Sequence, residues 1–360
     1  ISFLYKSLIM KKINIIYILP EIKKASGGAK VIYSHSAILN NLDKSISCKI
    51  IHLKKKITYK IEESLNKRFQ IFKKNFSGWD GRKMKVSKHF SPNKKWFEND
   101  LNRSKKINFN KNLDFIILPE ICSHFAEDLG LIKNKINYGI FVQGFYHMNS
   151  TNNYKKLTKS YKNAKLILSD SEYSIKCLNN IFPQFKNKVF RVHFSIDKKK
   201  FKIKSKSNII TYMPRKLPDH ASLLIFYLNN LLPKNWSIKP LKNVSEKYLT
   251  TTLSKSKIFL SFSNFEGIGI PPIEAALSGN KVIGYTGGGG VEYWKSPIFT
   301  KVESGEINDF GQKLLKEVKN YKVNWISKTQ KKRTKLSKQY SLELEKKSLN
   351  LLVKKIKELF

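Results

Sequence analysis

Short apolar runs recur along the chain and alternate with longer, partly polar segments. Runs rich in Ile, Val, Leu and Phe are typical of strands buried on both faces, and the segments between them are long enough for crossover helices. This alternation predicts parallel sheets with helices on both sides. The runs are residues 13–19, 48–53, 114–118, 138–142, 165–169 and 189–192, and then 208–213, 236–241, 257–262 and 281–285.

A polar, charged segment separates the two sets of runs. Residues 193–208 read HFSIDKKKFKIKSKSN, which is typical of a linker. The fold class predicted is therefore α/β, with two doubly wound, Rossmann-like domains. We place the first domain at residues 10–200 and the second at residues 201–335.

The two ends of the chain and one internal segment lie outside this alternation. A C-terminal helix is predicted over residues 336–360, packing back on the body, because Leu349, Leu352, Ile356 and Leu359 share one helix face. We interpret residues 1–9 as an extension before a more natural start at Met10. Residues 54–110 show weak periodicity and predict an irregular insertion.

Composition limits the classes of protein to consider. The chain has 360 residues, is 41% hydrophobic and carries a net charge of +43, so it can bury a core and attracts anionic partners. Only six of its 69 basic residues are Arg, which disfavours a nucleic-acid reader. The excess of Lys reflects either a compositional bias or a basic face toward a membrane or an acidic ligand.

Cysteine usage and the absence of a long apolar run bear on location. Cys48, Cys122 and Cys177 form neither a metal-binding spacing nor a disulfide framework, which favours a reducing compartment. The run at 13–19 is too short to cross a bilayer. We expect a cytoplasmic protein that contacts the inner face of the membrane peripherally.

The most informative motif lies at residues 266–280 and reads EGIGIPPIEAALSGN. Glu266 follows the strand at 257–262, at the edge of a parallel sheet where ligands bind. Pro271 or Pro272 suits the first turn of a short helix that carries Glu274 and ends at Gly279. An acidic residue near a helix start is also explained by the helix dipole, but that explanation accounts for Glu274 alone.

This motif resembles the donor-binding signature of retaining glycosyltransferases of the GT-B fold, in the large family 4 group. The resemblance implies two domains facing across a cleft, with Glu266 on the transferred sugar and Glu274 on the ribose of the nucleotide. It also places the donor against residues that connect the two glutamates. These are Gly267, Ile268, Gly269, Ile270 and Pro271, of which Ile268 and Ile270 replace the commoner Phe and Leu.

A basic pair follows the strand at 208–213. The resemblance implies that Arg215 and Lys216 hold the donor diphosphate, although Pro-Arg replaces the usual Gly-Arg and Lys216 is closer to Arg215 than is common. Cations there would stabilise the charge that grows on the leaving group, in place of a metal ion. We therefore expect no metal and no cofactor besides the donor substrate. Adjacent cations in so basic a chain are equally consistent with solvated surface.

Three further segments are candidates for the site or its frame. Gly27 and Gly28 precede a predicted helix, and the resemblance places them near donor phosphate and acceptor; His35 on that helix is predicted to be a core residue. Gln143 ends the strand at 138–142, where the family often has His, and it is predicted to contact the sugar, with His147 as the alternative. The run GGGG before Glu292 lacks a Walker motif, and we assign Glu292 a structural role.

The resemblance implies a metal-independent hexosyltransferase that moves a sugar from a nucleotide-diphosphate donor to a glycan or lipid-linked acceptor with retention, in bacterial surface polysaccharide or lipopolysaccharide synthesis. Only 50 residues separate Arg215 from Glu266, so a shortened second domain is expected. Two alternatives remain open: an epimerase-like enzyme acting on sugar nucleotides, and a non-enzymatic basic protein that binds membrane or nucleic acid.

Overall fold

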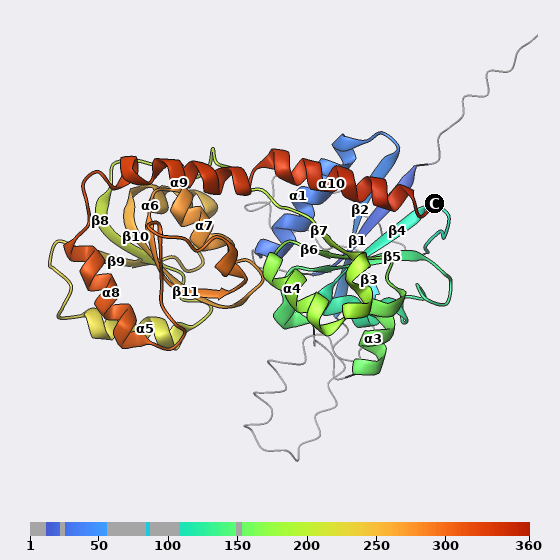
Figure 1. The fold of residues 1–360 in the computed structure, drawn as a ribbon, viewed down its shortest axis with the longest axis horizontal. Helices are drawn as coiled ribbons and strands as arrows, with labels where there is room; N and C mark the ends of the chain where they lie inside the picture. Colours follow the sequence, from blue (N-terminus) through green and yellow to red (C-terminus); the bar gives the residue numbers. More distant parts are fainter. Residues whose placement is uncertain (1–11, 22–25, 56–83, 87–107, 149–152) are drawn as a thin grey trace, which may run out of the picture. The chain divides into compact units, whose positions relative to one another are not determined.

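The structure is a computed structural model that describes residues 12–21, 26–55, 84–86, 108–148 and 153–360. The predicted extension at 1–9 and most of the predicted insertion at 54–110 lie outside the described residues. The described chain forms two compact units (Figure 1). The first comprises residues up to Phe141, His147–Leu168 and Lys346–Phe360, and the second comprises Val142–Tyr146 and Ser169–Glu345.

The first sheet confirms the predicted parallel arrangement. Its strand order is β3-β2-β1-β4-β5-β6-β7, and β3 runs antiparallel to β2 at one edge. Each apolar run in the first half of the sequence became a strand, while β3 lies within the predicted insertion. The strands are β1 (Ile13–Pro20), β2 (Ile46–Lys55), β3 (Met84–Val86), β4 (Asp114–Pro119), β5 (Asn137–Val142), β6 (Leu166–Ser169) and β7 (Val189–Arg191).

Helices and short 3-10 turns connect these strands. The first of them, α1 (Gly27–Leu42), buries Val31, Ile32 and His35, which confirms that His35 is a core residue; its Nδ1 lies 3.4 Å from the Tyr17 hydroxyl. The other connections are η1 (Glu120–Ala126), η2 (Phe145–His147), α3 (Tyr154–Asn163), α4 (Glu172–Ile181) and η3 (Pro183–Lys188).

The second sheet is parallel throughout, with the order β12-β11-β10-β8-β9. Helices α6 and α7 cover one face, and α5 and α8 cover the other (Figure 1). The rings of Phe262, Tyr285 and Phe310 pack together between the sheet and α8. The elements are β8 (Ser207–Tyr212), α5 (Pro218–Leu228), β9 (Ser237–Pro240), α6 (Glu246–Lys255), β10 (Ser256–Glu266), α7 (Ile270–Leu277), β11 (Lys281–Gly288), η4 (Gly289–Glu292), β12 (Phe299–Lys301) and α8 (Ile307–Lys319).

Two helices, rather than one, form the C-terminal part of the chain. Helix α9 (Trp325–Gln339) ends before Tyr340, and α10 (Leu342–Lys357) begins two residues later, so the predicted segment 336–360 contains a break. The predicted apolar face of the tail is buried at Leu349, Leu352 and Ile356. Within the first unit, Lys357 forms an ion pair with Asp43 at 2.7 Å.

A partly buried lysine directly before β8, Lys206, contacts the ends of α6 and α7 in the second unit. The Lys206 ammonium donates to the Ser278 carbonyl at 2.5 Å and to the Leu253 carbonyl at 3.2 Å, which are the ends of α7 and α6. Burial, and secondarily the Arg333 guanidinium of α9, lowers the pKa of Lys206 to about 7. A charge held in this place therefore disfavours the folded state near neutral pH.

This geometry predicts that stability rises with pH. Between the folded pKa of about 7 and the ordinary value of 10.5, the unfolded chain binds a proton at Lys206 that the folded chain does not. Raising the pH from 7 to 9 should therefore increase the free energy of unfolding in urea by about 2 kcal/mol through this group. Lys206→Met should remove that increment, whereas Lys204→Met, at an exposed position of the same segment, should retain it. Identical pH slopes in both variants would contradict the assignment.

Candidate functional site

The carboxyl edge of the second sheet brings two predicted site residues into contact. Strands β8 and β10 are parallel neighbours, so the loop after β8 and the end of β10 meet at one edge. The Lys216 ammonium lies 3.1 Å from the Glu266 carboxylate, and both side chains are about one quarter exposed. The neighbouring Arg215 is exposed and has no hydrogen-bond or ion-pair partner among the described residues. The edge thus presents two cations and one carboxylate to solvent.

The turn from Glu266 into α7 has the predicted form. Gly269 precedes the helix with φ of +72°, and both Pro271 and Pro272 lie in its first turn, where their missing N–H groups cost nothing. Gly279 follows the last turn with φ of +85°, as expected for a helix that ends in the left-handed conformation.

Helix α7 is buried on every side from Pro272 to Leu277, and this includes the acidic residue. Glu274 is only 8% exposed. On a helix at the protein surface, a glutamate side chain would normally be in contact with water. A buried carboxylate needs polar partners, and Glu274 does interact with other groups of the protein.

Glycines let three backbone segments of the second unit touch. A Cβ on Gly267 would lie 1.6 Å from the Gln143 carbonyl oxygen, and a Cβ on Gly289 would lie 1.4 Å from the Gly267 carbonyl oxygen. Only residues without a side chain permit these approaches. The backbone of Gln143, a predicted sugar contact, therefore lies against the turn that carries Glu266.

A buried tyrosine fixes the same turn from the other side. The Tyr293 hydroxyl donates to the Gly269 carbonyl at 2.7 Å. Burial, reinforced by the nearby Glu266 and Glu292 carboxylates, raises the pKa of Tyr293 well above its ordinary value, so the phenol keeps its proton. No pattern in the sequence marks Tyr293 as a site residue, because a tyrosine after a glycine-rich loop is not distinctive.

Glu292 has the structural role that the sequence predicted. Its carboxylate is almost fully buried and accepts from Arg191 at 2.7 Å, from the Tyr340 hydroxyl at 3.1 Å and from the Glu172 backbone N–H at 2.8 Å. The last contact places a negative charge at the amino end of α4, where the helix dipole favours it. The carboxylate therefore connects the glycine-rich loop to β7, α4 and the end of α9.

Gly27 and Gly28 lie in the first unit. They form the first turn of α1 instead of preceding it, with Ser26 at the N-cap. Their predicted role near the donor phosphate stays a prediction. His147, the alternative to Gln143, is exposed in η2.

No protein-family model matches the chain, and no curated protein matches it in sequence. Solved structures do match over nearly the whole chain. A glycosyltransferase from Rickettsia africae is 15% identical and has a TM-score of 0.63, covering 97% of this chain and 98% of its own.

Two structures with bound ligands are similar to the same degree. The Anabaena protein HepE in complex with UDP and glucose is 9% identical, with a TM-score of 0.60, covering 96% of this chain and 100% of its own. TarM from S. aureus, in complex with fondaparinux, α-GlcNAc-glycerol and UDP, is 12% identical, with a TM-score of 0.61, covering 96% and 99%.

The chain has the GT-B fold. At 9–15% identity these likenesses establish the fold alone. In this GT-B protein, Lys216, Glu266 and Glu274 all belong to the second unit.

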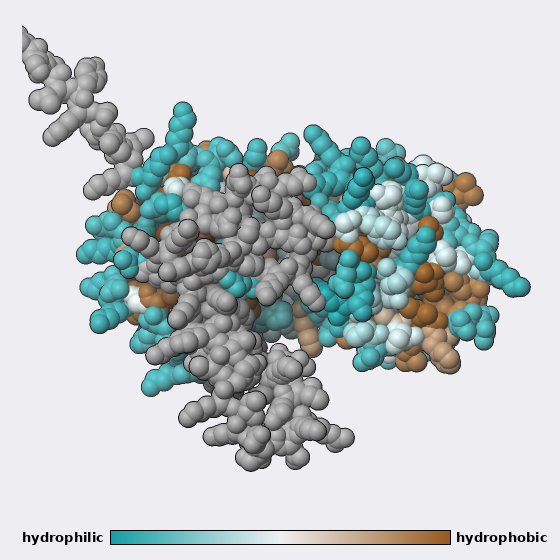
Figure 2. All heavy atoms as spheres, turned by 180° about the vertical axis from the view of Figure 1, so that it is seen from behind, coloured by the Kyte–Doolittle hydropathy of each residue, from teal (hydrophilic) through white to brown (hydrophobic). Residues whose placement is uncertain are grey.

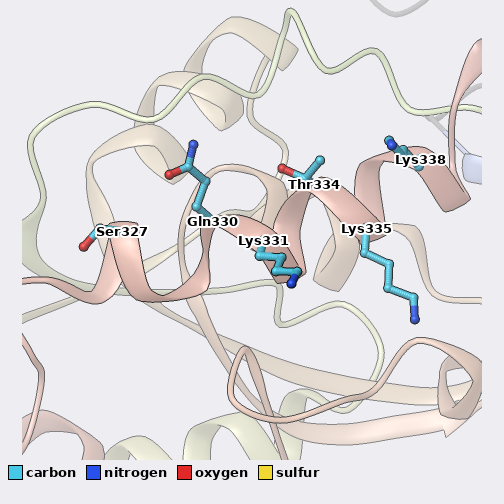
Figure 3. Close-up of a pocket in the computed structure, with 6 residues that line it drawn as sticks. All are labelled: Ser327, Gln330, Lys331, Thr334, Lys335 and Lys338. Carbon is cyan, nitrogen blue, oxygen red and sulfur yellow. The ribbon is translucent and has the colours of Figure 1, made fainter.

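A concavity of about 570 Å³ lies elsewhere in the second unit, along α9 (Figure 3). Its lining comes from one helix and includes none of the predicted site residues: Ser327, Gln330, Lys331, Thr334, Lys335 and Lys338. A groove lined by one polar helix face has neither convergent groups nor enclosure, so the candidate site stays at the sheet edge. Among the described residues, no group of three or more His, Cys, Asp or Glu side chains is placed to hold a metal ion.

The buried carboxylate of Glu292 yields a stability prediction with an internal control. Glu292→Ala would leave Arg191 and the first N–H of α4 without this partner, and we expect a loss of about 3 kcal/mol in the free energy of unfolding. Glu172 pairs with the same guanidinium at 2.8 Å but is 71% exposed, so Glu172→Ala should cost less than about 1 kcal/mol. Urea denaturation of both variants measures the difference, and equal losses would contradict it.

Proposed function

We propose that this protein is a glycosyltransferase that moves a hexose from a nucleotide-diphosphate donor to a glycan or lipid-linked acceptor, with retention of anomeric configuration. The observation that carries the proposal is the contact between Lys216 and Glu266 at the carboxyl edge of β8 and β10, within a GT-B fold. Ligands of parallel α/β sheets bind at this edge.

The charged groups suit the two ends of such a donor. Arg215 and Lys216 would bind the diphosphate, and Glu266 would accept hydrogen bonds from hydroxyls of the sugar. Because Lys216 and Glu266 are 3.1 Å apart, a single small molecule reaches both. Negative charge grows on the diphosphate as the sugar leaves, so the two cations stabilise the transition state more than the ground state.

The nucleotide would lie against the turn and helix that follow Glu266. Glu274, in the first half of α7, would accept hydrogen bonds from the ribose hydroxyls. Backbone N–H groups between Gly267 and Ile270 lie at the start of α7, where a helix terminus favours an anion. Gln143 would contact the sugar from the segment packed against Gly267.

The proposed reaction needs no side chain as base and no divalent metal. The acceptor oxygen bonds to the anomeric carbon on the face from which the diphosphate departs, and the bond from that carbon to the phosphate oxygen breaks. The acceptor proton passes to the departing phosphate oxygen. Arg215 and Lys216 supply the charge stabilisation that a metal ion gives in other enzymes.

The ligands in similar structures indicate which donors and acceptors to test first. HepE was solved with UDP and glucose, and TarM with UDP and α-GlcNAc-glycerol. A further structure of 14% identity is named as a lipopolysaccharide outer core galactosyltransferase, WaaB. We propose a role in bacterial surface polysaccharide or lipopolysaccharide synthesis on this basis.

Nucleotide binding is the direct test. UDP, GDP or ADP at about a hundred times its Kd should raise the Tm by about 5 °C, with EDTA present as well as without it. Glu274→Ala should abolish the shift, whereas Glu343→Ala, at an exposed position of α10, should leave it intact. If none of the three nucleotides changes the Tm of the wild-type protein, the proposed function is wrong.

We further propose that the end of the second unit that carries α5 contacts an anionic membrane surface. Leu223, Phe226 and Leu231 are each more than half exposed, and residues 220–245 contain no acidic residue. Figure 2 shows hydrophobic residues gathered on the part of the second unit where α5 and α8 lie. Exposed apolar side chains flanked by lysines suit an anionic bilayer; the lysines are Lys234, Lys239 and Lys242. None of the helices in the described part of the chain is both long and apolar enough to span a bilayer.

Vesicle co-sedimentation tests this contact. Binding to phosphatidylglycerol-containing vesicles should persist in part at 0.5 M salt, because the apolar contribution is not screened. Phe226→Ser should remove the salt-resistant part, and Val323→Ser, at a fully exposed position in the α8–α9 loop, should not. Complete loss of wild-type binding at high salt would reduce the interaction to nonspecific charge attraction and contradict the proposal.

A further inference from the structure

An irregularity in β10 lies directly before Glu266. Ser263 pairs with Thr286 and Glu266 pairs with Gly288, so three steps along β10 correspond to two along β11. The strand therefore holds one extra residue, which is a β-bulge. Bulges of this kind redirect a side chain and are common beside functional sites.

The bulge contains a phenylalanine in a conformation that favours glycine. Phe265 has φ of +50°, and the residue is 58% exposed. A large apolar side chain in the left-handed region carries a conformational cost, and a residue that stays more than half exposed regains little of that cost through burial. In a regular strand, successive side chains point to opposite faces of the sheet. The bulge interrupts this alternation at Phe265, the residue before Glu266.

Two tyrosines extend this exposed ring into a surface that we call the aromatic platform, formed by Phe265, Tyr146 and Tyr173. The ring of Tyr146 lies 4.9 Å from that of Phe265 and 5.8 Å from that of Tyr173, with which it is stacked. The Tyr146 hydroxyl donates to the Tyr173 hydroxyl at 3.0 Å. A Cβ on Gly288 would lie 2.1 Å from the Tyr146 hydroxyl, so the absence of a side chain there makes room for this ring.

The platform and the charged pair are joined at consecutive residues, Phe265 and Glu266. The charged pair, Lys216 and Glu266, can form ion pairs and hydrogen bonds with phosphates and hydroxyls. The face of an aromatic ring cannot form such bonds. A pyranose ring has both kinds of surface: hydroxyls around its edge and a face of C–H bonds that carries partial positive charge. Such a face is attracted to the negative face of an aromatic ring.

We propose that the aromatic platform binds a sugar ring of the acceptor, beside the position where Glu266 takes the donor sugar. The acceptor is thereby assigned to the class of carbohydrates that present a pyranose at the accepting end. This inference rests on the proposed function, since it uses Glu266 as the donor contact.

The variant Phe265→Gly distinguishes a role of the ring in sugar binding from a role in stabilising the fold. Phe265→Gly removes the aromatic face and also relieves the left-handed backbone, so the Tm should stay the same or rise. Binding of methyl hexopyranosides, in the gluco, galacto and manno series, is measured by saturation-transfer NMR with the stabilising nucleoside diphosphate present. The Kd of the best-binding glycoside should rise about tenfold in Phe265→Gly, which corresponds to about 1.4 kcal/mol. Phe265→Trp should restore it.

The controls distinguish the platform from the donor site. The Tm shift given by the nucleotide should be the same in Phe265→Gly as in wild type, because the ring makes no donor contact. A smaller shift would assign the ring to the nucleobase and overturn the proposal. Unchanged sugar binding in Phe265→Gly, or no binding of any of the glycosides to wild type, overturns it also. No nucleotide shift in wild type refutes the proposed function instead.

Discussion

The geometry of the candidate site depends on backbone contact at Gly267. The carbonyl of Gln143 presses on this residue from one side, and the Gly267 carbonyl occupies the space where a side chain on Gly289 would be. Backbone atoms cannot change rotamer to relieve a contact, so these three segments hold one another in a fixed arrangement. This backbone packing fixes the positions of Glu266, which precedes Gly267, and of the turn to α7, which follows it.

Hydrogen bonds and an ion pair made by two side chains, Tyr293 and Glu292, then hold the closely packed backbone segments in place. Tyr293 donates to the carbonyl of Gly269, and Glu292, one residue earlier, anchors the same loop to Arg191 and to the start of α4. Both side chains are buried, so water does not compete for these partners. The loop that supports the site is therefore rigid on the side away from solvent, while Arg215 and Lys216 remain accessible.

The features predicted from the sequence are those set by local pattern. The apolar runs gave the sheet strands, and Pro271, Pro272 and Gly279 gave the bounds of α7, because caps act through neighbouring residues. The short strand β12 and the break between α9 and α10 were missed. The left-handed conformation of Phe265 and the hydrogen bond from Tyr293 to Gly269 could not be predicted from the sequence either. Both depend on segments that come together only in the folded protein.

The Lys216–Glu266 ion pair is weak enough to suit the proposed binding of a diphosphate at this edge. Both groups are partly exposed, so their attraction is worth less than about 1 kcal/mol. Each hydrogen bond between a cation and a phosphate is worth about 1.5–3 kcal/mol, and a diphosphate offers several acceptors. A donor that reaches this edge would therefore displace the carboxylate from Lys216 at little cost. Glu266 would then be left beside the sugar with its acceptor oxygens available, so the weak pair places both groups before the donor arrives.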